Sequence, residues 1–390
     1  MSLQTVLPTD AAQATLVARI HVPALGPVLC LVTPDDVLDL SAVAATSADL
    51  MALPAPAQAI AAARSNLPRI AATSSVLANS TENSRNAQTP YLLAPCDLQP
   101  IKAAGVTFVA SMLERVIEEQ ARGDATRAQA VRASISKIVG DNLRAVVPGS
   151  AQAIKVKDVL MAQGLWSQYL EVGIGKDAEV FTKSQAMSAV GWGAEIGIHP
   201  ESHWNNPEPE IVLAVSPTGQ VQGAALGNDV NLRDFEGRSA LLLGKAKDNN
   251  ASCAIGPFIR LFDAHFTMDD VRQCDINLHV SGTDGFVMQG ESALNQISRD
   301  PLDLVAQTIN ANHQYPDGFM LFLGTMFAPT QDRFAKGEGF THAVGDTVTV
   351  STPKLGGLTN RVNTCDKITP WTYGARDLMR SLGRRGLLAS

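Results

Sequence analysis

The chain has 390 residues, 45% of them hydrophobic and 18% charged, which is the balance of a globular protein with a large buried core. Its formal net charge of −7 argues against a nucleic-acid partner, for which we expect a basic stripe. No apolar run reaches the ~18 residues that a transmembrane helix needs, so we expect no membrane partner.

The cysteines and histidines argue against a metal site built from sulfur or imidazole. The five cysteines are scattered and form no C-x-x-C pair, which predicts buried free thiols in a reducing cytoplasm. The first residues lack the basic and apolar regions of a secretion signal, which also favours a cytoplasmic location. Only His199 and His203 stand four apart, and Pro200 between them favours a loop over the helix that a shared metal would require.

The first quarter of the chain predicts a small unit of its own. Residues 15–43 alternate short apolar runs with Pro, Gly and Asp turns, which is typical of small antiparallel strands. Residues 45–94 are rich in Ala, Ser, Asn and Pro without a strong period, so we expect a loosely packed connector with a helix around residues 57–64. We therefore predict a small N-terminal domain with β-strands at residues 1–94 and the main domain at residues 95–390.

Helices are predicted next. After Gly105, apolar residues recur at helical spacing up to Ile117, with charged residues beside this stripe, which indicates an amphipathic helix. The polar residues 123–150 favour more helix, and residues 150–172 a further one.

Three carboxylates between residues 208 and 229 are spaced so that a hairpin would bring them together on one face. Glu208 and Glu210 are two apart, so on a strand both side chains leave by the same face. IVLAV then reads as a buried strand, SPTGQ as a turn, and VQGAALGND as a returning strand that carries Asp229 back beside the pair. Three oxygen ligands on one face suit Mg²⁺ or Mn²⁺ better than zinc. The alternative is a solvated strand edge, which is the commoner setting of an isolated E-x-E pair.

The rest of the chain is rich in predicted strands. Gly and Asp turns separate apolar runs beyond Pro257, and Asp300-Pro301 opens a helix between them. A buried strand follows and ends at Gly324-Thr325.

Three segments of the chain together resemble the core of the fumarylacetoacetate hydrolase superfamily: NPEPEIVLAV, GNDVNLRDFEG and AKDNNASCAIGP. The resemblance runs from about residue 95 to about residue 365. It implies a mixed, β-rich α+β fold with a β-roll core, and a homodimer or tetramer. It also implies that Glu208, Glu210 and Asp229 hold a catalytic Mg²⁺, with Mn²⁺ or Ca²⁺ as substitutes.

The same resemblance implies roles for further residues. Lys247 falls on the family lysine by its distance to Cys253, and we expect burial and the metal to lower its pKa so that it acts as a base. Gly324 and Thr325 match a family pair that holds the substrate carboxylate. Lys183, in an F-x-K segment, is a candidate for binding a carboxylate, and an exposed structural lysine is the alternative.

The predicted helix after Gly105 departs from the family at one position. Family hydrolases carry N-Y-x-x-H-x-x-E on a helix that closes over the site, and its His and Glu activate water. Here the Glu is kept as Glu114, but Ser111 stands at the His position, where we assign it to substrate binding. Without the imidazole the usual base for hydrolytic C–C cleavage is missing.

Dehydration fits the retained residues better than hydrolysis. With Lys247 as base and Glu114 as acid, a 2-oxo acid can lose water across C3 and C4. Segments such as SHWNNPEPE and HQYPDGF resemble the 2-keto-3-deoxy-D-pentonate (xylonate or arabinonate) dehydratase branch of non-phosphorylative pentose catabolism. That branch makes 2,5-dioxopentanoate from a small 2-oxo sugar acid. The alternatives are a diketo-acid hydrolase or 2-oxo acid decarboxylase on the same fold, and a non-catalytic metal-binding protein.

Overall fold

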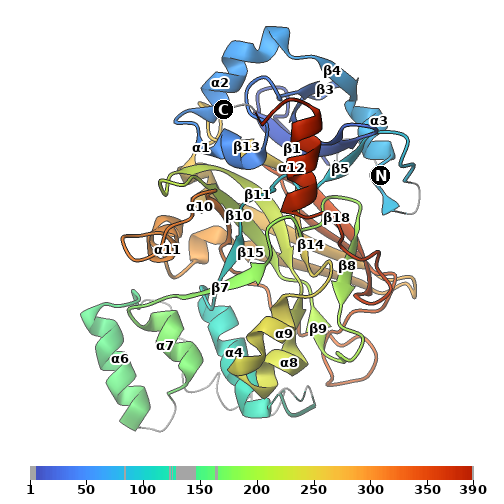
Figure 1. Ribbon diagram of the computed structural model, residues 1–390. Coiled ribbons are helices and arrows are strands. Elements are labelled where there is room, and N and C mark those ends of the chain that lie inside the picture. The colour runs from blue at the N-terminus through green and yellow to red at the C-terminus, as the bar shows by residue number, and fades with distance from the viewer. Residues whose placement is uncertain are drawn as a thin grey trace.

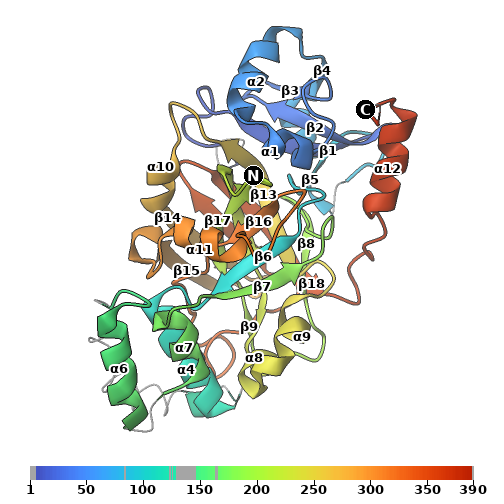
Figure 2. The ribbon, with the colours of Figure 1, turned by 60° about the vertical axis from the view of Figure 1, so that its left-hand side comes forward.

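One large sheet runs through the whole molecule (Figures 1 and 2). The computed structural model describes residues 6–82, 85–122, 124, 126–128, 146–162 and 166–388. Eleven strands form the large sheet in the order β4-β3-β2-β1-β13-β11-β10-β16-β6-β7, with β5 paired to β1. Their bounds are β1 Leu16–Val22, β2 Gly26–Val32, β3 Asp36–Asp39, β4 Arg69–Ala72, β5 Tyr91–Leu93, β6 Ile101–Gly105, β7 Glu179–Ser184, β10 Pro209–Val215, β11 Val221–Asp229, β13 Cys253–Leu261 and β16 Phe319–Phe322.

A smaller sheet packs against one face of the large one. It has five strands in the order β15-β14-β17-β18-β8, and a separate pair joins β9 to β12. On β14, exposed and buried residues alternate, and its buried face shares a core cluster with every second residue of β10. The bounds are β8 Glu195–Ile198, β9 Asn205–Asn206, β12 Asn231–Leu232, β14 Asp275–Ser281, β15 Val287–Ala293, β17 Thr347–Thr352 and β18 Gly356–Thr364.

The N-terminal strands continue the large sheet. The strands predicted at residues 15–43 are β1 to β3, and β1 pairs with β13 from Leu16 opposite Arg260. Strands on both sides of residue 94 therefore belong to one sheet, and an independent domain at residues 1–94 stays a prediction. The expected connector is more ordered than predicted, because α1 (Ser47–Ala52) buries Leu50 and Met51 and α2 (Pro56–Ala63) and α3 (Thr73–Ala78) follow it.

One group of helices, which includes the helix after β6, lies at the lower end of the molecule in Figure 1. The predicted amphipathic helix is α4 (Val109–Ala121), and its apolar stripe packs on α7 (Gln168–Ile174). The single helix expected at residues 150–172 is in fact two, α6 (Ala151–Ala162) and α7, the second opened by the Ser167 cap. Most of the helix expected at residues 123–150 lies outside the described residues.

The remaining helices are short and mostly peripheral. Asp300 caps α11 (Pro301–Thr308) by accepting a hydrogen bond from the Leu302 amide, as its Asp-Pro start predicts. The others are α8 Arg233–Arg238, α9 Leu243–Lys247, α10 Met268–Arg272 and α12 Ala375–Arg384. None of the helices in the described residues combines the length and the apolar character needed to cross a membrane.

The predicted thiol and histidine environments are largely confirmed. All five cysteines are free, and four are buried, but Cys365 is partly exposed and so departs from the prediction. His199 and His203 lie in a loop, as the proline between them predicts.

The long segment between β16 and β17 is held by a buried polar cluster. Asp346 accepts hydrogen bonds from both terminal nitrogens of Arg333, at 2.5 and 2.7 Å, and pairs with His342 at 3.1 Å. All three side chains are fully buried. Gly324 and Thr325 lie at the start of this segment, and the buried cluster holds its other end, next to β17.

We expect Asp346→Asn to lower the free energy of unfolding by about 3–5 kcal/mol, because it removes the buried one of the two carboxylates that contact the Arg333 charge. Urea denaturation followed by circular dichroism measures this loss. Asp284→Asn is the matched control, since Asp284 also contacts Arg333, at 3.3 Å, but is half exposed. Equal losses in the two variants would contradict the role given to burial.

Candidate active site

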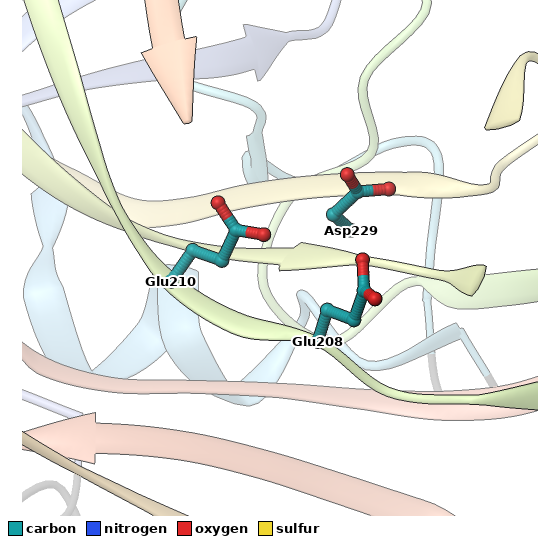
Figure 3. A group of neighbouring side chains, drawn as sticks. All are labelled: Glu208, Glu210 and Asp229. Atoms are coloured by element: carbon teal, nitrogen blue, oxygen red, sulfur yellow. The ribbon is translucent and has the colours of Figure 1, made fainter. Parts of the chain in front are cut away.

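Pairing of β10 with β11 brings the three predicted carboxylates together. Glu210 lies opposite Gly227, and the Asp229 amide donates to the Glu208 carbonyl at 3.0 Å. One carboxylate oxygen from each of Glu208, Glu210 and Asp229 lies within 4.8 Å of the others, and Figure 3 shows the side chains converging. Among the described residues they are the one such group close enough to share an ion. The predicted hairpin is therefore confirmed, and a solvated strand edge is excluded because all three side chains are buried.

Burial makes this carboxylate cluster electrostatically costly. Burial, together with the charges of Asp229 and Glu208, holds the pKa of Glu210 well above its ordinary value. Burial also acts to raise the pKa of Asp229, but Lys183 and Lys247 outweigh it and lower that pKa. The donor set is three buried carboxylates, which fits a hard divalent cation such as Mg²⁺ and would gain from its charge.

Two buried lysines contact the cluster from different sides. Lys247, at the end of α9, places Nζ 2.6 Å from Glu208 Oε2 and 3.2 Å from Asp229 Oδ2. Burial alone would lower its pKa, but the carboxylates of Asp229 and Glu208 outweigh burial and raise it. The expectation of a lowered pKa is thus not met in the metal-free site.

Lys183 lies behind the cluster. Its Nζ contacts Asp229 Oδ1 at 2.9 Å and donates to the Lys247 carbonyl at 2.6 Å, and its side chain is fully buried. It is not among the residues that line the adjoining cavity. The alternative of an exposed structural lysine is wrong, because the side chain is fully buried. A role in binding a carboxylate of the substrate stays a prediction, and the observed contacts of Lys183 hold Asp229 and the end of α9.

A cavity opens beside the carboxylates. Gly324 reaches it by donating its amide hydrogen to Glu210 Oε2 at 2.6 Å, and Gly324 is required because its φ is +88° and a Cβ would lie 2.1 Å from the Thr107 hydroxyl. The lining residues are Ala104, Gly105, Val106, Ser111, Arg115, Glu179, Phe181, Glu208, Glu210, Asp229, Glu236, Lys247, Gly324 and Thr325. The cavity thus includes the predicted Ser111, Lys247, Gly324 and Thr325.

Glu114 is placed differently from the prediction. It lines a neighbouring hollow that shares Ser111, Arg115, Glu208 and Thr325 with the cavity, although Glu114 is not among the residues that line the cavity itself. Its carboxylate lies 3.1 Å from the Arg233 guanidinium. Glu114 thus lies toward α8, and the acid role expected for it stays a prediction.

Glu179 is the carboxyl group that sequence reasoning missed. It lies opposite Gly105 in the β6–β7 pair, where a Cβ on residue 105 would come within 2.1 Å of its carboxylate. Burial raises the pKa of Glu179, although Arg115 and Lys247 act against this. A sequence signal existed, since Glu179 stands two before Phe181 of the F-x-K segment and both line the cavity.

Arg115 ties the closing helix to the carboxylates, and this too was missed. Its guanidinium contacts Glu208 at 2.6 Å, Glu236 of α8 at 2.7 Å and Glu118 at 2.8 Å. Glu118 also receives a hydrogen bond from Arg233 at 2.6 Å. The quoted segment GNDVNLRDFEG contained Arg233 and Glu236, but nothing local distinguished them from surface charges.

Comparison with known proteins supports the resemblance. Residues 175–363 match the family described as fumarylacetoacetate (FAA) hydrolase C-terminal. A 2-dehydro-3-deoxy-D-arabinonate dehydratase of Saccharolobus solfataricus is 29% identical over 194 residues, 49% of this chain and 60% of the relative. A probable 2-keto-3-deoxyxylonate dehydratase of Haloferax volcanii is 26% identical over 196 residues, 50% of this chain and 64% of the relative. The chain thus spans less than two thirds of either curated relative.

Solved structures show the same fold. The apo form of a 2-keto-3-deoxy-D-arabinonate dehydratase superposes with a TM-score of 0.59 at 20% identity, covering 90% of this chain and 99% of the other. The same coverage and identity, with a TM-score of 0.58, hold for such a dehydratase complexed with magnesium and 2,5-dioxopentanoate. The predicted mixed α+β fold is confirmed.

We expect Glu210→Gln to raise the melting temperature of the metal-free protein at pH 7. The fold raises the pKa of Glu210 above the ordinary 4.5, so the stability that this residue supports is present below pH 4.5 and lost as pH rises through the folded pKa. Mg²⁺ at one hundred times its Kd should stabilise the unaltered protein by about 2.7 kcal/mol and the variant far less. Scanning calorimetry with and without Mg²⁺ measures both effects. Glu291→Gln, at an exposed position of β15, is the control, and an equal Mg²⁺ effect in all three proteins would refute the site.

Proposed function

We propose that this chain, which matches the fumarylacetoacetate (FAA) hydrolase C-terminal family over residues 175–363, removes water from a 2-keto-3-deoxy-D-pentonate to form 2,5-dioxopentanoate. The observation that carries the proposal is the buried carboxylate cluster with Lys247 in contact and a cavity beside both. The dehydratase names of the two curated relatives support the substrate class, derived from D-xylonate or D-arabinonate. We also expect a homo-oligomer in the cytoplasm.

Glu208, Glu210 and Asp229 would hold the divalent cation, Mg²⁺ or the substitutes Mn²⁺ and Ca²⁺. When bound, the cation supplies Lewis-acid polarisation of the substrate 2-oxo group. Thr325 and the Gly324 backbone border the cavity at Glu210, where they can receive the substrate carboxylate. Ser111 has its hydroxyl bonded to the Phe108 carbonyl at 2.9 Å, so its oxygen keeps acceptor capacity toward a substrate hydroxyl.

Lys247 is the proposed base for a C3 proton. It can accept a proton only when its amine is neutral, and the facing charges of Glu208 and Asp229 oppose this. These two residues are also proposed metal ligands, so loading the site would weaken their hold on the ammonium. Turnover should therefore depend on the cation through the state of Lys247 as well.

Glu179 is the proposed acid for the C4 hydroxyl. Its raised pKa favours the protonated carboxyl, which can donate to a departing hydroxide. It lines the cavity together with Lys247, whereas Glu114 does not. We therefore propose Glu179 in the role that the sequence suggested for Glu114.

Other reactions on the same fold fit less well. A hydrolase needs a base for water, and no histidine stands among the described residues that line the cavity. A 2-oxo acid decarboxylase would leave Glu179 without a role. A non-catalytic metal-binding protein would leave a buried lysine in contact with two metal ligands for no chemical reason.

The purified protein with Mg²⁺ should convert 2-keto-3-deoxy-D-xylonate or 2-keto-3-deoxy-D-arabinonate to 2,5-dioxopentanoate, and EDTA should stop it. NMR spectroscopy identifies the product. Pyruvate and a free acid from acylpyruvates would favour the hydrolase instead, and CO₂ from oxaloacetate the decarboxylase. If a panel of five- and six-carbon substrates gives no turnover, the proposal fails.

Glu179→Gln should lower kcat by about 10²–10⁴-fold, because the amide cannot donate the proton that the leaving hydroxide needs. Glu114→Gln is the matched comparison, because it also replaces a carboxyl group by an amide, but in the hollow next to the cavity. This variant should retain most of the activity. Initial rates at saturating substrate and Mg²⁺ decide between them. A larger loss in Glu114→Gln would restore the assignment made from sequence.

A further inference from the structure

Loss of water accounts for only half of the proposed reaction. Elimination across C3 and C4 of a 2-keto-3-deoxy-pentonate gives 5-hydroxy-2-oxopent-3-enoate, an enone that still carries its C5 alcohol. To reach 2,5-dioxopentanoate, one hydrogen must leave C5 and one must arrive at C4. Lys247 and Glu179 are already engaged at C3 and at the leaving hydroxyl, so a third group is needed at the far end of the substrate.

We propose that Glu236 is a further catalytic residue that takes the hydrogen from C5 and returns it to C4. This inference rests on the proposed dehydration. Glu236 belongs to α8 and lines the same cavity as Lys247 and Glu179, with 6% of its surface exposed. Glu236 thus reaches the cavity from a helix, whereas Glu179 reaches it from the strand β7.

The contacts of Glu236 leave it able to act on a ligand. Its Oε2 lies 2.7 Å from the Arg115 guanidinium, but the contact lacks hydrogen-bond alignment, and this oxygen has no aligned partner among the described residues. Buried carboxyl oxygens are normally hydrogen-bonded, so one that lines a cavity without an aligned donor requires an explanation. A substrate hydrogen that it removes and returns provides one.

The charge environment of Glu236 suits both directions of transfer. Burial raises its pKa to about 7, although Arg115 and Lys247 act against this. A carboxyl group whose pKa lies near neutral pH can accept a proton and donate it again, because neither step is strongly unfavourable. By contrast, Arg115 and Arg233 lower the pKa of the neighbouring Glu118 against the effect of burial, which keeps it ionised.

The three groups close a balanced cycle. In the elimination, Lys247 takes a C3 proton, the C4–O bond breaks, and Glu179 protonates the departing hydroxide to give water. Glu236 then takes a C5 proton, and the electron pair of that C–H bond forms C4=C5. The C3=C4 pair shifts to C2=C3 and the C2=O pair moves onto the C2 oxygen, which gives a dienolate.

In the last step Glu236 protonates C4 and Lys247 protonates C3. The C5 hydroxyl proton returns to Glu179 as the C5 aldehyde forms. Each group ends in the state in which it began, and the only net loss from the substrate is one water molecule. No oxidant, reductant or further co-reactant is required.

Glu118 provides a matched control. It is also a buried glutamate that contacts Arg115, at 2.8 Å, but it is absent from the cavity lining. Exchanging either residue for glutamine removes one carboxylate from the same guanidinium. Only the change at Glu236 removes a proton carrier from the cavity.

The test follows the reaction of the full chain with Mg²⁺ by ultraviolet absorbance of the enone and by NMR. The unaltered protein should release 2,5-dioxopentanoate without free enone. Glu236→Gln should release 5-hydroxy-2-oxopent-3-enoate, with its conversion to product slowed by about 10²–10⁴-fold. Glu118→Gln should form product without releasing enone.

Two outcomes would overturn the inference while leaving dehydration intact. One is release of enone by the unaltered protein, which would mean that isomerisation occurs in solution. The other is formation of 2,5-dioxopentanoate by Glu236→Gln without enone. If the unaltered protein makes neither compound, the proposed dehydration fails and this inference with it.

A second measurement covers the case in which Glu236→Gln does not fold. Single turnover of C5-dideuterated substrate by the unaltered protein should place deuterium at C4 above the level of spontaneous isomerisation. It should also show a primary isotope effect on formation of the aldehyde. A C4 hydrogen drawn wholly from solvent, with no isotope effect, would overturn the role of Glu236.

Discussion

Mutual repulsion among three buried carboxylates is the constraint on which the rest of the site depends. Glu208, Glu210 and Asp229 lie within one ion's reach, and burial removes the water that would otherwise screen them. The protein offsets this charge with two ammonium groups, Lys183 from behind and Lys247 from the cavity side. A divalent cation bound among the three carboxylates would further reduce their mutual repulsion.

The helices above the sheet are bound to this cluster by charge as well as by packing. Arg115 of α4 contacts a cluster carboxylate directly and also reaches α8 through Glu236. Arg233 of α8 in turn pairs with Glu118 of α4. Because each arginine bridges two elements, a shift of α4 or α8 would leave buried charges unpaired, which is strongly destabilising. The cavity wall is therefore fixed relative to the three carboxylates.

Small residues decide which carboxyl groups enter the cavity. Gly105 has no side chain where the Glu179 carboxylate lies, and Gly324 allows the backbone to approach Glu210 closely enough to donate a hydrogen bond. Ser111, at the position where family hydrolases carry histidine, leaves the cavity lined by carboxyl groups and an amine. This composition supports proton transfer at carbon more readily than activation of water.

The carboxylate cluster and most strands could be predicted from the sequence alone, because they depend on short-range rules. Strand period, turn residues and hairpin pairing place Glu208, Glu210 and Asp229 together within a single hairpin. The positions of Glu179, Arg115 and Glu236 were decided only by the tertiary structure. They come from β7, α4 and α8, whose approach depends on long-range sheet pairing and helix packing. The contacts of Glu114 and Lys183 were likewise decided only by the tertiary structure, because a residue's position in a motif does not determine which side of a packed helix or strand faces the cavity.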